Sequence, residues 1–307
     1  MKNTLSANRL PSRNGVSPSR VVVPHGSWPT LLDFLSDRFP AVGTSVWAQR
    51  LSHGLVLSEN GSRYTATQAC PHGHAVYYYR ETLQETALPD KAMVLFEDER
   101  LLVADKPHFM PVTPGGHYLH NSLLVQLKQL TGLESLSPLH RIDRETAGLV
   151  VFAKHQQDRH AYQALFRQQA VEKQYEAVAA FQPGLALPMV YRSRIVESDR
   201  FFLSQEVPGE PNSETHLTLL AQQGDLALYG LMPISGKRHQ LRIHMNALGL
   251  PIVGDQFYPK LLRGPAEPED FAMPLHLLAK RIRFTDPMTN QLREWVSPRM
   301  WRQFNPD

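Results

Sequence analysis

Short extended segments dominate the chain between Met93 and Phe284, and they constrain its fold most. Each is a run of β-branched, leucine or aromatic residues bounded by turn-forming residues, which is typical of strands. Only a few segments of helical length interrupt them. Many hairpin-like strands with few helices indicate an α+β domain with a mixed, mostly antiparallel sheet. The expected strands are MVLFE, RLLVADK, GLVVFAKH, VEKQYEAVAAF, SRIVES, FFLSQEV, ETHLTLLAQ, LALYGLM and KRIRF, and the expected helices are SLLVQLKQL, HQQDRHAYQALFRQQA and GKRHQLRIHMNALG.

Length and composition allow two domains. The chain has 307 residues, of which 42% are hydrophobic and 20% charged, so it can bury a substantial core. Local composition predicts a disordered basic tail over residues 1–24, a small α/β domain over 25–85 and a larger domain over 89–307. The net charge of +3 is compatible with a polyanionic partner without demonstrating one.

The N-terminal tail and the cysteine content are informative about the cellular compartment of the protein. MKNTLSANRLPSRNGVSPSR contains basic but no acidic residues and lacks the apolar segment of a secretory signal, although an organelle transit peptide has a similar composition. The single cysteine, Cys70, permits no intramolecular disulfide and suits a reducing compartment, so we expect a cytoplasmic protein. No apolar run approaches the roughly 20 residues that cross a bilayer, so we expect no membrane partner.

The small domain begins with two expected helices. The first, in SWPTLLDFLSDRF, is capped by Ser27 or Thr30, and the second runs from Thr44 to Ser52. Strands at Val56 and in HAVYYYRE follow, with an Asn-Gly turn between them. This order resembles the alpha-L RNA-binding domain of small ribosomal proteins, and the resemblance implies RNA binding. The alternative is a small packing domain with scattered basic side chains, namely Arg38, Arg50, Arg63 and Arg80.

One aspartate, Asp143, lies between Arg141 and Arg144 in the segment PLHRIDRETAGLVVFAKH. Neighbouring cations favour the ionised form of a carboxylate, and an ionised aspartate is a competent nucleophile. An ordinary surface ion-pair cluster explains the same pattern. These residues alone leave both interpretations open.

Two short segments raise the question of a metal site. CPHGH places three potential ligands within five residues, and His140 with Asp143 forms an HxxD pair. Neither segment has a second cluster of ligands nearby. We therefore expect CPHGH to be an exposed loop and the protein to bind no metal. The three residues of the CPHGH segment are Cys70, His72 and His74.

Five segments, in order, resemble those of the RluA-type pseudouridine synthases. HRIDRETAGLVVFAK is similar to the segment around the family's nucleophile, with Ile142 in place of leucine. EKQYEAV is similar to Lys-x-Tyr-x-Ala, and SGKRHQLRIHMNALGLPIVGDQFY to a segment from Thr-Gly-Arg-x-His-Gln to Gly-Asp-x-x-Tyr, with Ser235 for threonine and Lys237 for arginine. EDERLLVADKPHFMPVTPGG and LHLLAKRIRFTDPMTNQ resemble the opening hairpin and the last strand. Together they cover roughly residues 93–295.

The resemblance implies a pseudouridine synthase fold and an isomerase that converts uridine to pseudouridine in structured RNA without a cofactor. It assigns Asp143 as the nucleophile, attacking carbon six of the base or the anomeric carbon of the sugar. Tyr175 is expected to pack on the uracil and to relay a proton from carbon five, Arg242 to pair with Asp143, and Arg141 to fill the space that the flipped uridine leaves. Arg238 is expected to share a helical face with Arg242. Further RNA contacts are expected from His140, Arg144, Lys237, Arg238 and His239, the last three at a helix start that favours phosphate.

Two other classes stay open. One is a non-catalytic RNA-binding protein on the same fold, which the presence of Asp143, Tyr175 and Arg242 disfavours. The other is a metal-dependent hydrolase using His140, Asp143 and Asp255, which chelator sensitivity would reveal. Members of the family act on large-subunit ribosomal RNA or on transfer RNA, so either is an expected partner. We expect a monomer without a small-molecule cofactor.

Overall fold

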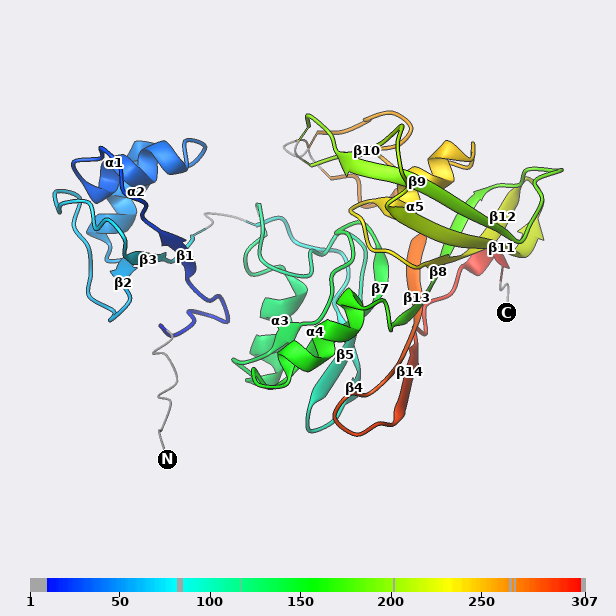
Figure 1. Cartoon of the computed structure of the whole chain (residues 1–307), viewed down its shortest axis with the longest axis horizontal. Coiled ribbons are helices and arrows are strands. Elements are labelled where there is room, and N and C mark those ends of the chain that lie inside the picture. Colours follow the sequence, from blue (N-terminus) through cyan, green and yellow to red (C-terminus); the bar gives the residue numbers. More distant parts are fainter. Residues whose placement is uncertain are drawn as a thin grey trace. The chain divides into compact units, whose positions relative to one another are not determined.

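The chain folds into two compact units (Figure 1). The computed structural model describes residues 10–81, 85–116, 118–200, 202–264, 267 and 269–304. The first unit consists of Met1–Thr86, Pro114–His120 and Lys128–Glu134. The second consists of Ala87–Thr113, Asn121–Leu127 and Ser135–Asp307. Two short segments that the sequence placed in the larger domain thus group with the first unit.

The first unit packs two helices against a three-stranded antiparallel sheet. The sheet order is β1-β3-β2, and the bounds are β1 Ser19–Val22, β2 Val56–Ser58, β3 Ala75–Tyr78, α1 Leu31–Arg38 and α2 Thr44–Ser52. Thr30 is the cap of α1. Its hydroxyl accepts a hydrogen bond from the Asp33 N–H, and the Asp33 carboxylate accepts one from the Thr30 N–H. The second predicted helix is confirmed with its bounds, and Phe34 and Trp47 are buried between the layers.

The predicted tail needs correction. Residues 1–9 lie outside the described part of the chain, but β1 pairs with β3 along its whole length. The prediction of disorder over residues 1–24 is therefore wrong for this strand. Val21 and Val23 contribute apolar side chains to the core of the unit, and the surrounding serines, prolines and arginines hid that short pattern.

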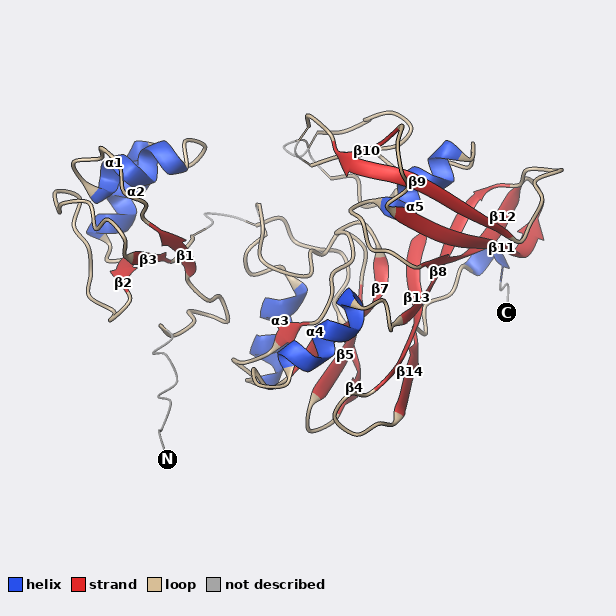
Figure 2. Cartoon of the chain, viewed as in Figure 1, coloured by secondary structure: helices blue, strands red, loops and turns tan. Residues whose placement is uncertain are grey.

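One mixed sheet forms the frame of the second unit (Figure 2). Its strand order is β10-β9-β11-β12-β8-β13-β7-β5-β4, with β14 beside β13 and β6 beside β7. The pairing of β7 with β13 is parallel and the other pairings found are antiparallel, which confirms the predicted α+β class. The bounds are β4 Met93–Glu97, β5 Leu101–Lys106, β6 Ser137–Pro138, β7 Ala147–Ala153, β8 Glu172–Ala180, β9 Met189–Glu197, β10 Ser204–Val207, β11 Ser213–Gln223, β12 Leu226–Pro233, β13 Leu277–Thr285 and β14 Leu292–Val296.

Two helices bury apolar side chains against different parts of this sheet. Helix α4 packs Tyr162 and Phe166 on residues of β5, β7 and β13, and α5 packs Leu241 and Met245 on residues of β8 and β12. Within the described part of the chain, no helix is both long enough and apolar enough to cross a membrane. The helix bounds are α3 Leu123–Thr131, α4 Arg159–Arg167, α5 Gln240–Ala247 and the short 3-10 helix η1 Arg302–Phe304.

Candidate active site

Asp143 lies in the loop between β6 and β7. Its backbone carbonyl accepts a hydrogen bond from the Thr146 N–H at 3.2 Å, which tightens the loop just before the buried strand. Gly148 then brings β7 against β13, because its φ is 112° and a Cβ there would lie 2.3 Å from the Ala279 carbonyl oxygen. The Thr-Ala-Gly step thus allows two parallel strands to approach closely and determines where the Asp143 loop ends.

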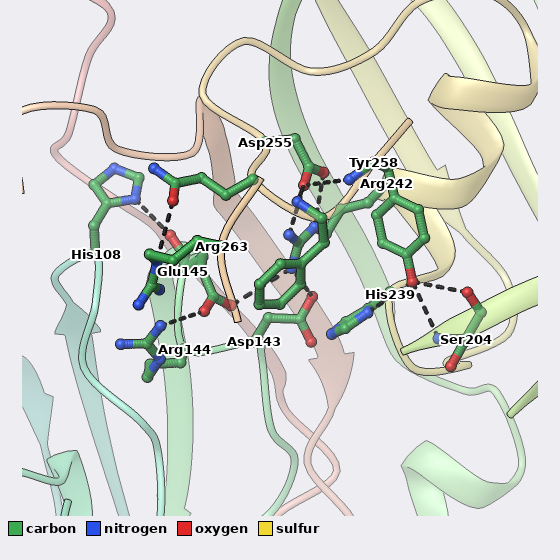
Figure 3. Close-up of polar contacts among 12 residues, drawn as sticks. His108, Asp143, Arg144, Glu145, Ser204, His239, Arg242, Asp255, Tyr258 and Arg263 are labelled. Atoms are coloured by element: carbon green, nitrogen blue, oxygen red, sulfur yellow. Dashed lines mark hydrogen bonds and ion pairs between the residues drawn. The ribbon is translucent and has the colours of Figure 1, made fainter. Parts of the chain in front are cut away.

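Three carboxylates lie around the guanidinium of Arg242, which is on α5 (Figure 3). Nε and Nη2 donate to the two oxygens of Asp255, at 2.8 and 2.7 Å. Nη1 lies 3.5 Å from Glu145 Oε2 and 3.7 Å from Asp143 Oδ2. The Arg242 side chain is 1% exposed and that of Asp143 is 25% exposed. The cation is therefore enclosed, while the Asp143 carboxylate stays accessible to solvent.

Opposite charges outweigh burial in this cluster. Burial lowers the pKa of Arg242, but the hydrogen bonds and charge of Asp255, with Glu145 and Asp143, raise that pKa above its ordinary value. Burial likewise raises the pKa of Glu145, yet Arg242 and Arg144 lower it to about 2. Both side chains are therefore charged at neutral pH, and a fixed network of charge-assisted hydrogen bonds lies behind Asp143.

Glu145 and Asp255 were not predicted as members of this site. Arg242 was expected to pair with Asp143 alone, and Asp255 was considered only as a metal ligand. Both acids lie inside the two segments that resemble the family, so the signal was present. Gly254 reinforces the position of Asp255: at its φ of 77°, a Cβ would lie 2.1 Å from the Pro274 carbonyl oxygen. Glycine at this position lets the chain turn so that the next residue reaches Arg242.

A buried lysine supports the Asp143 loop from β5. Lys106 Nζ donates hydrogen bonds to the carbonyl oxygens of Pro107, at 2.9 Å, and Arg144, at 3.0 Å. Burial lowers the pKa of Lys106 to about 7, against the opposing effect of Glu145 and Asp143. The bond to the Arg144 carbonyl ties the residue next to Asp143 to a central strand.

Lys106→Met is expected to flatten the pH dependence of stability. Between about pH 7 and the ordinary lysine pKa of 10.5, the unfolded chain binds a proton that the folded chain does not, so the free energy of unfolding rises with pH. The variant loses this contribution, which is at most about 1.4 kcal/mol per pH unit. Urea unfolding across this range measures the slope, with the exposed Lys260→Met as control. Equal slopes for wild type and Lys106→Met would contradict the lowered pKa.

Tyr175 lies on β8, between Leu231 of β12 and Ala279 of β13. It packs against the same apolar cluster as Leu241 of α5. Burial, and then the charge of Asp143, raise the pKa of Tyr175 well above its ordinary value. The neutral phenol thus lies within electrostatic range of Asp143 and can donate a hydrogen bond or pack on a planar ring.

His140 and Arg141, predicted to contact RNA, have different environments. His140 Nε2 accepts a hydrogen bond from the Val151 N–H at 3.2 Å, and its ring stacks on Phe166 with the centroids 4.8 Å apart. Burial lowers the pKa of His140 to about 3, so the ring is neutral. These contacts favour a packing role for His140, whereas Arg141 is exposed in the same loop.

Arg144 is engaged by carboxylates of the protein. Its Nη2 lies 2.7 Å from Glu145 Oε1, and its Nη1 pairs with Glu269, which also binds Arg263 at 2.5 Å. The side chain is 21% exposed. These contacts favour a role in holding Glu145, and through it the Arg242 network, over direct RNA contact.

The segment before α5 differs from the predicted helix. The helix begins one residue after His239, whose φ of 58° is left-handed and interrupts helical geometry. Arg238 therefore does not share a helical face with Arg242, and that prediction is wrong. Its guanidinium donates instead to the Leu203 carbonyl at 2.8 Å. Lys237 is exposed just before the helix, while His239 is buried.

The residues of the metal alternatives already make internal contacts. Asp255 binds Arg242, and His140 accepts a backbone hydrogen bond. In the CPHGH loop, His72 Nδ1 lies 3.0 Å from the Pro24 carbonyl oxygen. Among the described residues, no three His, Cys, Asp or Glu side chains are grouped so that they could hold a metal ion.

Comparison with known proteins agrees with this geometry. The family model of RNA pseudouridylate synthase matches residues 100–247. A dual-specificity RNA pseudouridine synthase RluA from Vibrio vulnificus is 30% identical over 67% of this chain and 82% of the relative. Ribosomal large subunit pseudouridine synthase D from Nitrosomonas europaea is 28% identical over 70% of this chain and 63% of the relative. The solved structure of human RNA Pseudouridylate Synthase Domain Containing 4 has a TM-score of 0.54 and 26% identity, and the match covers 69% of this chain and 90% of that one.

The region matched by the family model includes Arg242 and two of its three carboxylate partners, Asp143 and Glu145. The family model spans Asp143, Tyr175 and Arg242, and the large mixed sheet that positions them is shared with a solved pseudouridylate synthase. Sequence, fold and cluster thus lead to one conclusion: this chain belongs to the RluA-type family and is an RNA pseudouridine synthase, an isomerase.

Proposed function

We propose that this synthase isomerises specific uridines of ribosomal or transfer RNA, with Asp143 as its nucleophile. The arrangement around Arg242 supports the proposal most. A partly exposed carboxylate lies 3.7 Å from a guanidinium that is itself enclosed and held by two other acids. The buried cation lies beside the carboxylate without covering it. That combination suits a nucleophile that must meet a large substrate.

The proposed isomerisation conserves atoms and electrons, so it requires neither a cofactor nor an oxidant. The bond between uracil N1 and ribose C1′ breaks, the uracil turns within the site, and C5 bonds to C1′. C5 then loses its proton and N1 gains one, so atoms and charge are conserved. Asp143 attacks uracil C6 or ribose C1′ and is released before the product leaves. The uridine must first leave the RNA stack, and the exposed Arg141 is suited to fill its place.

Tyr175 is assigned to packing on the uracil and to hydrogen-bond donation. Its pKa is raised by burial and by Asp143, so the phenolate is a minor species at neutral pH. A general base works best with a pKa near the operating pH. Tyr175 therefore suits orientation of the turning uracil better than removal of the C5 proton.

The family resemblance makes ribosomal and transfer RNA the substrate classes to test, and the name of one relative supports the ribosomal large subunit. The Vibrio relative is a dual-specificity RNA enzyme and the Nitrosomonas relative acts on the ribosomal large subunit. Mapping pseudouridine across total RNA, with and without this chain, identifies the uridine. We expect a defined site to be lost without the chain and restored by the wild-type protein. Identical maps, with no conversion of ribosomal or transfer RNA by the purified protein, would refute the proposal.

We also propose that residues 25–85 form an RNA-binding domain distinct from the catalytic domain over 89–307. Arg50 stacks over Trp47, 4.9 Å from the ring centroid. Burial and the charge of Arg80 lower the pKa of Arg50, while Glu81 raises it. In the described part of the chain, the buried Nε atoms of both arginines lack a hydrogen-bond partner. A phosphate bound beside the two neighbouring guanidinium groups would offset the repulsion between their charges.

Replacing Arg50 and Arg80 together by glutamine in the full chain is expected to weaken binding of structured RNA about tenfold and to reduce the salt slope of log Kd by about 1 to 2. The physical reason is the loss of one or two phosphate contacts. Kd is measured across a salt series, with Arg281→Gln as control, since Arg281 already pairs with Glu294. An unchanged Kd and slope would favour the alternative of a packing domain.

A further inference from the structure

His239 lies between Tyr258 and Asp143 (Figure 3). The residue is 8% exposed, and its φ of 58° is one that histidine and asparagine adopt more readily than most residues. Its Nδ1 is 2.9 Å from the Tyr258 hydroxyl oxygen. Nε2 is therefore on the side of the ring away from Tyr258, and the charge of Asp143 acts on the ring.

The hydrogen bonds of Tyr258 determine which nitrogen of His239 carries the proton. The Tyr258 hydroxyl lies 2.9 Å from the Ser204 carbonyl oxygen, which can only accept, so the hydroxyl proton points there. The Ser204 N–H donates to the same hydroxyl oxygen at 3.1 Å. With its single proton used, the hydroxyl can only accept from His239 Nδ1. The proton is thus on Nδ1.

The remaining nitrogen then has a lone pair. Burial lowers the pKa of His239, and Arg242 acts in the same direction, against Asp143, Glu145 and Asp255. The ring is therefore neutral, and Nε2 is a hydrogen-bond acceptor. The Asp143 carboxylate on the same side of the ring is also an acceptor. Two acceptors cannot bond to one another, so a group placed between them must supply an N–H or an O–H.

We propose that His239 Nε2 accepts a hydrogen bond from the target nucleotide, from either the uracil N3–H or the ribose 2′-hydroxyl, and so holds the uridine beside Asp143. This inference rests on the proposed reaction at Asp143. If N3–H is the donor, His239 also selects the base, because N3 of cytosine is an acceptor and would face a lone pair. A hydroxyl donor would instead make His239 select ribose over deoxyribose.

Two substitutions separate the nitrogens of His239. In His239→Asn, the amide nitrogen takes the place of Nδ1 and can still donate to Tyr258, but nothing replaces Nε2. Asparagine also tolerates the left-handed backbone. In His239→Gln, the longer side chain can place its carbonyl oxygen, an acceptor, near the Nε2 position. The exposed His216→Asn serves as a control, because His216 contacts Glu214 on β11.

The substrates are short RNAs carrying the mapped uridine, the same RNA with 3-deazauridine, which replaces N3–H by C–H, and the same RNA with 2′-deoxyuridine. We expect His239→Asn to bind the uridine RNA about tenfold more weakly than the wild type, as for loss of one hydrogen bond. The affinity of the wild type should fall by a similar factor on one of the two analogues. On that analogue, His239→Asn and wild type should bind with equal affinity. That analogue identifies the donor.

Several results would overturn the proposal. One is wild-type affinity of His239→Asn for the uridine RNA. Another is an equal deficit on all three RNAs, which indicates a structural role alone. If the melting temperature of His239→Asn falls markedly, the binding of His239→Gln is measured instead. The proposal then requires His239→Gln to bind the same analogue more weakly than the uridine RNA, as the wild type does. Failure of the proposed function is separate, since it would appear as normal turnover by Asp143→Asn.

Discussion

Asp143→Asn is expected to reduce pseudouridine formation at least about a thousandfold while RNA binding survives. The substitution keeps the size of the side chain but removes the charge, and a neutral amide cannot serve as the nucleophile. Because Asp143 is partly exposed and lies 3.7 Å from Arg242, it makes little contribution to packing. Single-turnover conversion of a mapped RNA measures the rate, and a filter-binding titration measures Kd.

The exposed Asp199→Asn is the matched control, because it removes one acidic charge from the surface in the same way. It should retain the wild-type rate. If Asp143→Asn retained one tenth or more of the wild-type rate, Asp143 would not be the nucleophile. A large loss of RNA binding would show that the residue acts in recognition instead.

Arg242→Met should abolish most activity and also destabilise the fold by about 3–5 kcal/mol. The stability cost follows from the partners: Asp255 binds both Nε and Nη2, and its side chain is 1% exposed, so the variant leaves a buried charge unpaired. The activity loss follows because the cation beside Asp143 disappears. Urea unfolding and single-turnover assays on the same preparation measure the two effects.

A second substitution separates these effects. Adding Asp255→Leu to Arg242→Met removes the stranded carboxylate, so stability should recover by at least about 2 kcal/mol while activity stays low. Arg281→Met is the control for a surface arginine and should cost about 1 kcal/mol or less. Full activity in the double variant would show that Arg242 serves only to neutralise Asp255.

The strand and helix order was largely readable from the sequence. Alternating β-branched and aromatic residues with turn residues between them are local signals, and so is the Thr30–Asp33 capping box. Strands β1, β6 and β14 were missed, since they are short or lie in polar surroundings and owe their existence to a paired neighbour. The mixed character of the sheet was also correctly predicted, because hairpin-like segments outnumbered helices.

The sequence by itself indicated the family, most of the order of elements and the candidate site residues Asp143, Tyr175 and Arg242, because these predictions follow from short segments of characteristic residues. Only the tertiary structure decided how the residues combine. In the folded protein, the buried guanidinium of Arg242 pairs with Asp255 and Glu145 as well as with Asp143.

The tertiary structure also placed Arg238 outside helix α5 and turned His239 toward Tyr258. The physical reason is that ion pairing, desolvation and proton position depend on which groups share a dry environment. Residues 97 positions apart, such as Glu145 and Arg242, meet only when the whole sheet has formed.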